Sequence, residues 1–184
     1  GVDIETNLIE INPKISKHDS IKGVSTKGMW YTGYPRTARG EKSKSRLAEL
    51  MPIITCVGYC AIFKVDGKLT SKTVVIPITS NKMIAWMRKF NLLDAPKVMH
   101  NGRYDSTYFL RYDAPLHNWA FDTYGMMHCW YVELKRRLDR VSAFVLRNHM
   151  FWKDESGGNL YEYNAKDCHM TAWACMVMLE QMPD

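Results

Sequence analysis

The sequence predicts an α/β fold in which helices flank a central mixed β-sheet. Two observations carry this prediction: apolar and β-branched runs form short candidate strands, and segments with helical periodicity separate them along the chain. With 184 residues, of which 46% are hydrophobic and 24% charged, the chain is large enough for one domain with its own core. We therefore expect a single domain over residues 1–184.

The first expected strand is "GVDIETN" at residues 1–7, because Val2, Ile4 and Thr6 favour extended backbone. The stretch that follows, over about residues 12–46, is rich in Gly, Ser, Thr and Lys. This composition predicts a long loop or insertion, and loops of this length in compact domains are commonly functional.

A β-hairpin is expected next. The apolar run "IITCVGYCAIFKV" at residues 53–65 predicts a buried strand, "DGK" at 66–68 the turn, and "TVVIPI" at 73–78 the returning strand. Cys56 and Cys60 share one face of the first of these strands. Core packing explains them better than zinc, since no second pair of ligands has the spacing of a zinc site.

The second half of the chain predicts one further strand and five helices. Ser80 and Asp122 are expected N-caps, because short polar side chains accept hydrogen bonds from the first amides of a helix. In the first of these helices, Ile84, Met87 and Leu92 are expected to face inward. The expected elements are a helix from 81 to about 93, a strand at 96–100, and helices at about 105–111, 123–134, 141–148 and 160–182.

Composition and charge exclude some classes of protein and favour others. No apolar run approaches the ~20 residues of a membrane-spanning helix and no secretory leader is visible, so no membrane partner is expected. Five cysteines, an odd number, favour a reducing intracellular compartment, either a cytoplasm or, for a phage protein, that of the host cell. The formal net charge of +6 favours a polyanion such as nucleic acid, and the basic run at 36–46 is either a solvated face or part of that contact.

Asp3 and Glu5 pose a physical problem in the first expected strand. Residues two apart in a strand point to the same face, so these two carboxylates lie side by side and repel each other. Two more acids have informative positions. Asp105 comes just after an expected strand, and Asp167 lies four residues after Tyr163, on the same face of the last helix.

Four acids on three separate elements can converge at one edge of the sheet. Their repulsion then needs a cation, and oxygen ligands suit Mg²⁺ or Mn²⁺. Two such ions ~3.5–4 Å apart can stabilise both the attacking and the leaving oxygen of a phosphoryl displacement. The pattern therefore predicts that Asp3 and Glu5 are metal ligands, which two ions could share.

The acidic motifs resemble those of the DEDD-type 3′→5′ exonucleases. Residues 3–5 are similar to their first motif, residues 101–105 to the second, and residues 163–167 to the third, whose tyrosine is typical of the DEDDy subgroup. The segment at 121–155 resembles the link between the second and third motifs in family A DNA polymerases, of the bacterial DNA polymerase I type and its phage relatives. The stretch at 12–46 departs from the family pattern because it is longer than the usual connection.

This resemblance implies a ribonuclease H-like fold and a reaction. The reaction is the metal-dependent hydrolysis of the last phosphodiester at the 3′ end of single-stranded DNA, with release of a nucleoside monophosphate. By the resemblance, the four acids hold the metal ions and Tyr163 orients the attacking water. The implied catalytic residues are Asp3, Glu5, Asp105, Tyr163 and Asp167, and the implied contacts to the terminal nucleotide are Thr6, Leu8, Ile9 and Asn101.

The chain begins without Met and no polymerase domain follows Asp184. We therefore expect either an excised proofreading domain or a stand-alone enzyme that processes DNA ends, with a polymerase domain as a partner in cis or in trans. Two alternatives stay open: an RNA 3′-end-trimming exonuclease of the same superfamily, and a catalytically inactive module that binds nucleic acid. Four converging negative charges argue against the inactive module, while the choice between DNA and RNA depends on whether the site admits a 2′-hydroxyl.

Several of these residues also have purely structural explanations. An isolated D-x-E pair is commonly a solvated surface pair, and Asn101 could simply shape a turn. Tyr163 could be a core aromatic residue with a solvated hydroxyl, and Leu8 and Ile9 could be ordinary core residues. Trp152, beside a polar stretch, is either a core residue or a platform that stacks on a base.

Overall fold

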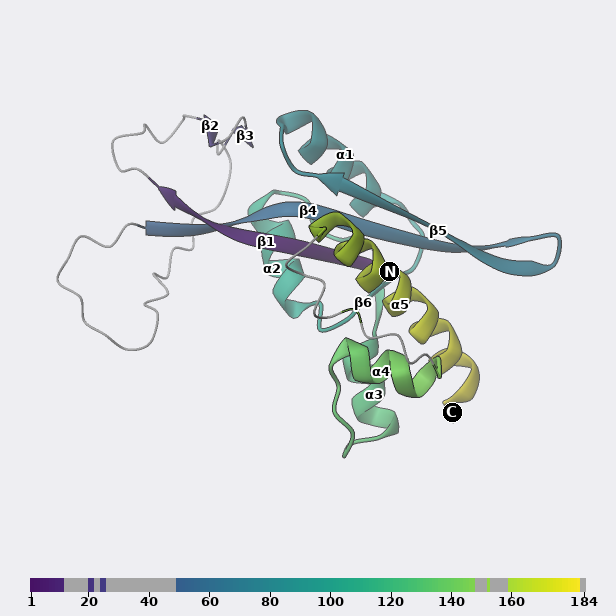
Figure 1. The fold of residues 1–184 in the computed structure, drawn as a ribbon. Coiled ribbons are helices and arrows are strands. Elements are labelled where there is room, and N and C mark those ends of the chain that lie inside the picture. The colour runs from purple at the N-terminus through teal and green to yellow at the C-terminus, as the bar shows by residue number, and fades with distance from the viewer. Residues whose placement is uncertain (12–19, 22–23, 26–48, 148–151, 153–158, 183–184) are drawn as a thin grey trace.

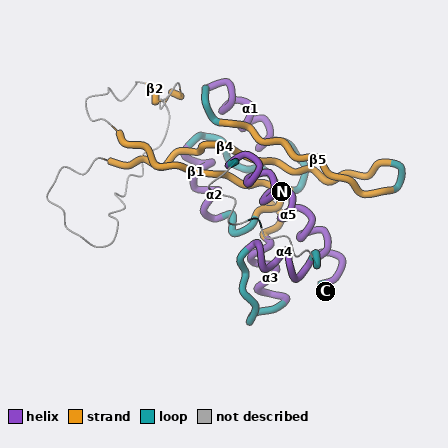
Figure 2. The backbone as a smooth tube through the Cα atoms, in the orientation of Figure 1, coloured by secondary structure: helices purple, strands orange, loops and turns teal. Residues whose placement is uncertain are grey.

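The computed structural model describes residues 1–11, 20–21, 24–25, 49–147, 152 and 159–182. Within these residues the protein is a mixed α/β arrangement with antiparallel and parallel strand pairs and five helices, which is compatible with the predicted α/β class (Figures 1 and 2). The described strands form an antiparallel sheet and two separate pairs, where one mixed sheet was expected. The strands are β1 (Val2–Ile11), β2 (Ser20–Ile21), β3 (Val24–Ser25), β4 (Glu49–Val65), β5 (Lys68–Pro77), β6 (Lys97–Met99) and β7 (Trp119–Asp122). The helices are α1 (Asn81–Leu92), α2 (Arg103–Arg111), α3 (Thr123–Trp130), α4 (Leu138–Val145) and α5 (Leu160–Gln181).

The longest strands form a three-stranded antiparallel sheet in the order β1-β4-β5. The register between β1 and β4 shifts after Glu5, which marks a β-bulge beside the first acidic motif. β4 and β5 continue as a long ribbon that projects from the body of the protein (Figure 1). The predicted turn at its tip is confirmed, because Asp66 and Gly67 have φ angles of 48° and 79°, as a two-residue type I′ hairpin requires.

A second, parallel pair joins β6 and β7, and β6 lies next to β1. The sequence did not predict β7, because its four residues are too few to show a period. The short antiparallel pair β2–β3 lies within the stretch at 12–46 that was expected to be a loop. The basic run at 36–46 lies outside the described residues.

Alternation along β1 gives the central sheet two different faces. Val2 and Ile4 point into the main hydrophobic core, where they meet Met87 of α1 and Phe109 of α2. Asp3 and Glu5 point to the opposite face by the same alternation. This second face is covered by α5, whose Cys168 and Ala172 pack against Cys60 of β4. The first acidic motif therefore faces the helix that carries the third.

Helix α1 confirms that Ile84 and Met87 are buried, but the expectation for Leu92 was wrong. Leu92 is 63% exposed, and Asn91 is fully buried in its place. Asn91 accepts a hydrogen bond from the Tyr59 hydroxyl at 2.7 Å and donates one to a backbone carbonyl at 2.6 Å. Because both ends of the amide are paired, a polar side chain occupies a core position that periodicity alone would give to an apolar one.

The two predicted N-caps differ in their hydrogen bonds. Asp122 caps α3, with its carboxylate accepting from two amides of the first turn at 2.9 and 3.4 Å. Ser80 occupies the N-cap position of α1 but makes no capping hydrogen bond with its side chain. α3 ends at Trp130 and α4 begins at Leu138, each about one turn earlier than expected.

The structure also bears on the cysteines and on helices that could cross a membrane. All five cysteines are free, as the odd count suggested. Cys56 and Cys60 are both buried, in agreement with a packing role. Among the residues that the structure describes, no helix is both long enough and apolar enough to cross a membrane.

Candidate metal centre

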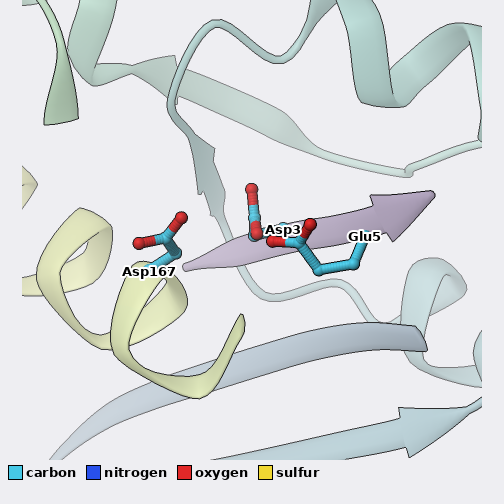
Figure 3. A group of neighbouring side chains, drawn as sticks. All are labelled: Asp3, Glu5 and Asp167. Carbon is cyan, nitrogen blue, oxygen red and sulfur yellow. The ribbon is translucent and has the colours of Figure 1, made fainter. Parts of the chain in front are cut away.

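Three of the four predicted acids gather between β1 and α5. Asp3 and Glu5 come from the strand and Asp167 from the helix, and one carboxylate oxygen of each lies within 4.8 Å of the others. Figure 3 shows the three carboxylates facing a common space. Asp3 and Glu5 are half-buried and Asp167 is buried, so water screens their repulsion only in part. Such a group is costly unless a cation lies among its oxygens.

Asp105, the fourth acid, lies in the first turn of α2 and is buried. It lies outside the compact group of three but within electrostatic reach of Glu5. Burial, and next the negative charge of Glu5, raise the pKa of Asp105 to about 7, and Asp122 also raises it. The structure therefore places the fourth acid near Glu5 on a third element, outside the group of Asp3, Glu5 and Asp167.

Two buried side chains hold the acids in place. The indole Nε1 of Trp152 donates to Oδ1 of Asp167 at 2.6 Å, and Nδ2 of Asn164 donates to Oδ2 of Asp3 at 2.8 Å. Trp152 is only 1% exposed, which excludes its ring from stacking on a base. Hydrogen bonds of this kind orient the ligands in metal sites and tune their affinity. Sequence reasoning missed both donors.

Gly58 of β4 allows α5 to lie close to the sheet at this point. A Cβ atom at position 58 would lie 2.3 Å from Oδ1 of Asn164 and 2.4 Å from Sγ of Cys168. Glycine is required at this position for lack of space, because at neither distance is there room for even a methyl group. The position of Asn164, and through it the orientation of Asp3, depends on this glycine.

The remaining predicted residues lie around the acids. Tyr163 is half-buried on α5, one turn before Asp167, and its ring packs against the cluster of Leu138, Trp152 and Met170. The hydroxyls of Thr6 and Tyr104 are hydrogen-bonded at 3.0 Å.

Asn101, Leu8 and Ile9 were predicted to contact the terminal nucleotide. Asn101 is exposed, has a φ of 58°, and donates its backbone N–H to Asp122 at 2.9 Å, so it shapes the turn between β6 and α2. Leu8 and Ile9 lie within β1, but their side chains are outside the described part of the chain.

The pH dependence of stability should report on Asp105. The ordinary pKa of its carboxyl is 3.8, whereas in the folded protein it is about 7. Between these values the folded state keeps a proton that the unfolded state has lost, so the free energy of unfolding falls as pH rises. We predict that the metal-free parent loses more stability between about pH 5 and pH 8 than Asp105→Asn does. Each kcal/mol lost from the free energy of unfolding would appear as a fall of about 2–4 °C in Tm.

The same carboxyl must be ionised to bind a metal ion, so Mg²⁺ should raise Tm more at pH 8 than at pH 5. Thermal unfolding followed by circular dichroism, with chelator and with Mg²⁺, measures both effects. An equal pH dependence in the parent and in Asp105→Asn would contradict the interpretation of Asp105.

A second prediction concerns the hydrogen bond from Trp152. Trp152→Phe keeps an aromatic ring in the core but removes the donor to Asp167, so the affinity for Mn²⁺ should fall by about 10–100-fold. Isothermal titration calorimetry measures this affinity. A matched control is Trp173→Phe, because Trp173 lies on α5, the helix that carries Asp167, but its indole donates to Ser71 at 3.2 Å instead. An affinity within about twofold of the parent would make Trp152 a packing residue only.

Neither the comparison with protein-family models nor the comparison with curated proteins found a match for this chain. The function is therefore inferred from the residues of the site.

Proposed function

We propose that the protein is a 3′→5′ exonuclease that hydrolyses the terminal phosphodiester of single-stranded DNA with the help of two divalent metal ions. The observation that carries the proposal is the gathering of Asp3, Glu5 and Asp167, with Asp105 close to Glu5. A ribonuclease H-like form of the mixed α/β fold is part of the proposal. In its support, β1 carries two of the acids, pairs with β4 and contacts β6.

The donor set fits divalent metal ions. Every candidate ligand is a carboxylate, which is the ligand type that Mg²⁺ and Mn²⁺ favour. Asp3, Glu5, Asp105 and Asp167 would hold the ions, which would supply positive charge near the attacking and leaving oxygens of the phosphodiester.

The other residues of the site supply orientation. Trp152 and Asn164 fix two of the carboxylates through buried hydrogen bonds. A phenol is largely protonated at neutral pH and is a poor base, so the role proposed for Tyr163 is to orient the attacking water through a hydrogen bond. Its ring packs beside Trp152, which places it next to the residue that holds Asp167.

The proposal also covers the substrate contacts, the product and the biological task. Thr6, Leu8, Ile9 and Asn101 would contact the terminal nucleotide, and the product would be a nucleoside monophosphate. Proofreading or DNA-end processing, with a polymerase domain in cis or in trans, would be the biological task. Five free cysteines support an intracellular, reducing setting.

A nuclease assay tests the proposal directly. Single strands of DNA and RNA with the same sequence carry a label at the 5′ end, and a second pair carries it at the 3′ end. With Mg²⁺ we expect shortening by one nucleotide at a time from the 3′ end of DNA, early release of the 3′ label, and no cleavage in excess chelator. Faster shortening of RNA would favour the RNA-trimming alternative. Binding without cleavage in both Mg²⁺ and Mn²⁺ would favour the inactive module.

A further inference from the structure

A cluster of aromatic rings lies where α3 and α4 meet. Trp130 ends α3, Tyr131 follows it, and Phe144 lies on α4, with ring centroids 5.0 Å apart for Trp130 and Tyr131 and 4.9 Å for Tyr131 and Phe144. Trp130 packs on the core cluster below, whereas Tyr131 is 40% and Phe144 46% exposed. Val132 and Leu134 are also exposed beside them. Trp130 therefore anchors the cluster to the core, while Tyr131 and Phe144 remain partly accessible to a ligand.

Cationic side chains lie close to these rings along the chain. Residues 131–147 contain five Lys or Arg side chains and two acids, of which Asp139 is buried. Arg137 and Arg140 contact the Asp139 carboxylate at 3.2 and 3.9 Å but remain largely exposed. The surface formed by Trp130, Tyr131, Val132, Leu134, Lys135, Arg136, Arg137, Arg140 and Phe144 is named the aromatic–basic surface below.

Two lines of contact run from the aromatic–basic surface toward the candidate metal centre. Arg136 lies over the ring of Tyr124 at 4.8 Å, and Tyr124 lies 5.9 Å from the ring of His100, just before the second acidic motif. On the other side, Leu138 at the start of α4 packs with Trp152, which binds the third motif. Figure 1 shows α3 and α4 together, below β6 and beside α5.

We propose that the aromatic–basic surface binds single-stranded nucleic acid upstream of the 3′-terminal nucleotide, by stacking bases on Tyr131 and Phe144 and neutralising phosphates with Lys135 and Arg136. Exposed rings interleaved with cations are the combination that holds single strands without sequence preference. The excess of Lys and Arg over acids in residues 131–147 favours nucleic acid, a polyanion, over a protein partner. The inference rests on the proposed function, because the same strand would enter the metal centre with its 3′ end.

Equilibrium binding of a fluorescent dT oligonucleotide of about 20 nucleotides, in chelator, tests the proposal apart from cleavage. Tyr131→Ala and Phe144→Ala should each weaken binding by about tenfold or more. Tyr131→Phe keeps a stacking ring and should bind like the parent. Trp86→Ala is the matched control, because Trp86 on α1 is equally exposed and has Lys89 over its ring at 5.3 Å, but lies elsewhere.

Lys135→Gln provides an independent electrostatic readout. The log–log slope of affinity against salt should become shallower by about 0.7 if one phosphate contact is lost. Lys82→Gln on α1 is the matched control for this charge and should leave the slope unchanged.

Cleavage of a dT oligonucleotide of about four nucleotides with Mg²⁺ separates this inference from the proposed function. Tyr131→Ala should slow cleavage of this short strand less than it slows cleavage of the long strand, because the short strand offers fewer upstream nucleotides to the surface. If the parent does not cleave but Tyr131→Ala still weakens binding of the long strand, the surface stands and the exonuclease proposal falls. If Tyr131→Ala, shown by circular dichroism to be folded, binds the long strand like the parent, the surface proposal is overturned. Self-association lost in Phe144→Ala, with strand binding unchanged, would overturn it in favour of a protein interface.

Discussion

Replacing Asp3 with Asn is expected to abolish cleavage and to stabilise the metal-free protein. Asn has the shape of Asp and keeps an oxygen that can accept the hydrogen bond from Asn164. It removes one negative charge from a group in which three carboxylates lie within 4.8 Å. The loss of a ligand that supports several kcal/mol of transition-state stabilisation corresponds to a fall in rate of more than about 10³-fold. The relief of repulsion should raise Tm, by about 2–4 °C for each kcal/mol.

Single-turnover cleavage with Mg²⁺ and thermal unfolding in chelator measure the two effects of Asp3→Asn. Glu180→Gln is a matched control, since Glu180 is an exposed acid near the end of α5. Its rate and its Tm should both stay close to the parent values. A variant at Asp3 that cleaves normally, or that unfolds at a lower temperature in chelator, would make this carboxylate a structural group.

The parts of the fold that the sequence predicted are those with strong local signals. The Asp66–Gly67 turn, the buried run of β4 and the helical period of α5 each lie within one segment. The error in α1 involves a partner distant in sequence. Asn91 replaces Leu92 in the core because the Tyr59 hydroxyl, 32 residues away, hydrogen-bonds its amide.

In the candidate site, too, local spacing could be predicted and partners distant in sequence could not. Asp3 and Glu5 could be predicted to share a face because a strand alternates with a period of two. Trp152 and Asn164 could not be assigned from spacing alone, because their hydrogen bonds span 15 and 161 residues of sequence. A weak signal did exist for Asn164, which lies three residues before Asp167 on the same helix, a spacing that puts both side chains on one face.

Replacing Tyr163 with Phe is expected to slow cleavage by about 10²–10³-fold, the range for losing one positioned polar group in an active site. The substitution deletes the hydroxyl and keeps the ring. The ring should still pack against Leu138, Trp152 and Met170, so the hydrogen bond from Trp152 to Asp167 should survive. Metal affinity should therefore stay within about twofold of the parent, because all four carboxylates remain in place.

Two further variants separate the hydroxyl of Tyr163 from its ring. Tyr161→Phe is the matched control, since Tyr161 lies on the same helix with an exposed side chain, and it should cleave at the parent rate. Tyr163→Ala removes the ring as well, so Trp152 loses a neighbour and metal affinity should fall along with the rate. Single-turnover release of the 3′-terminal nucleotide and titration with Mn²⁺ provide both measurements. If Tyr163→Phe cleaves within twofold of the parent, Tyr163 is a core aromatic residue, and another group must orient the water.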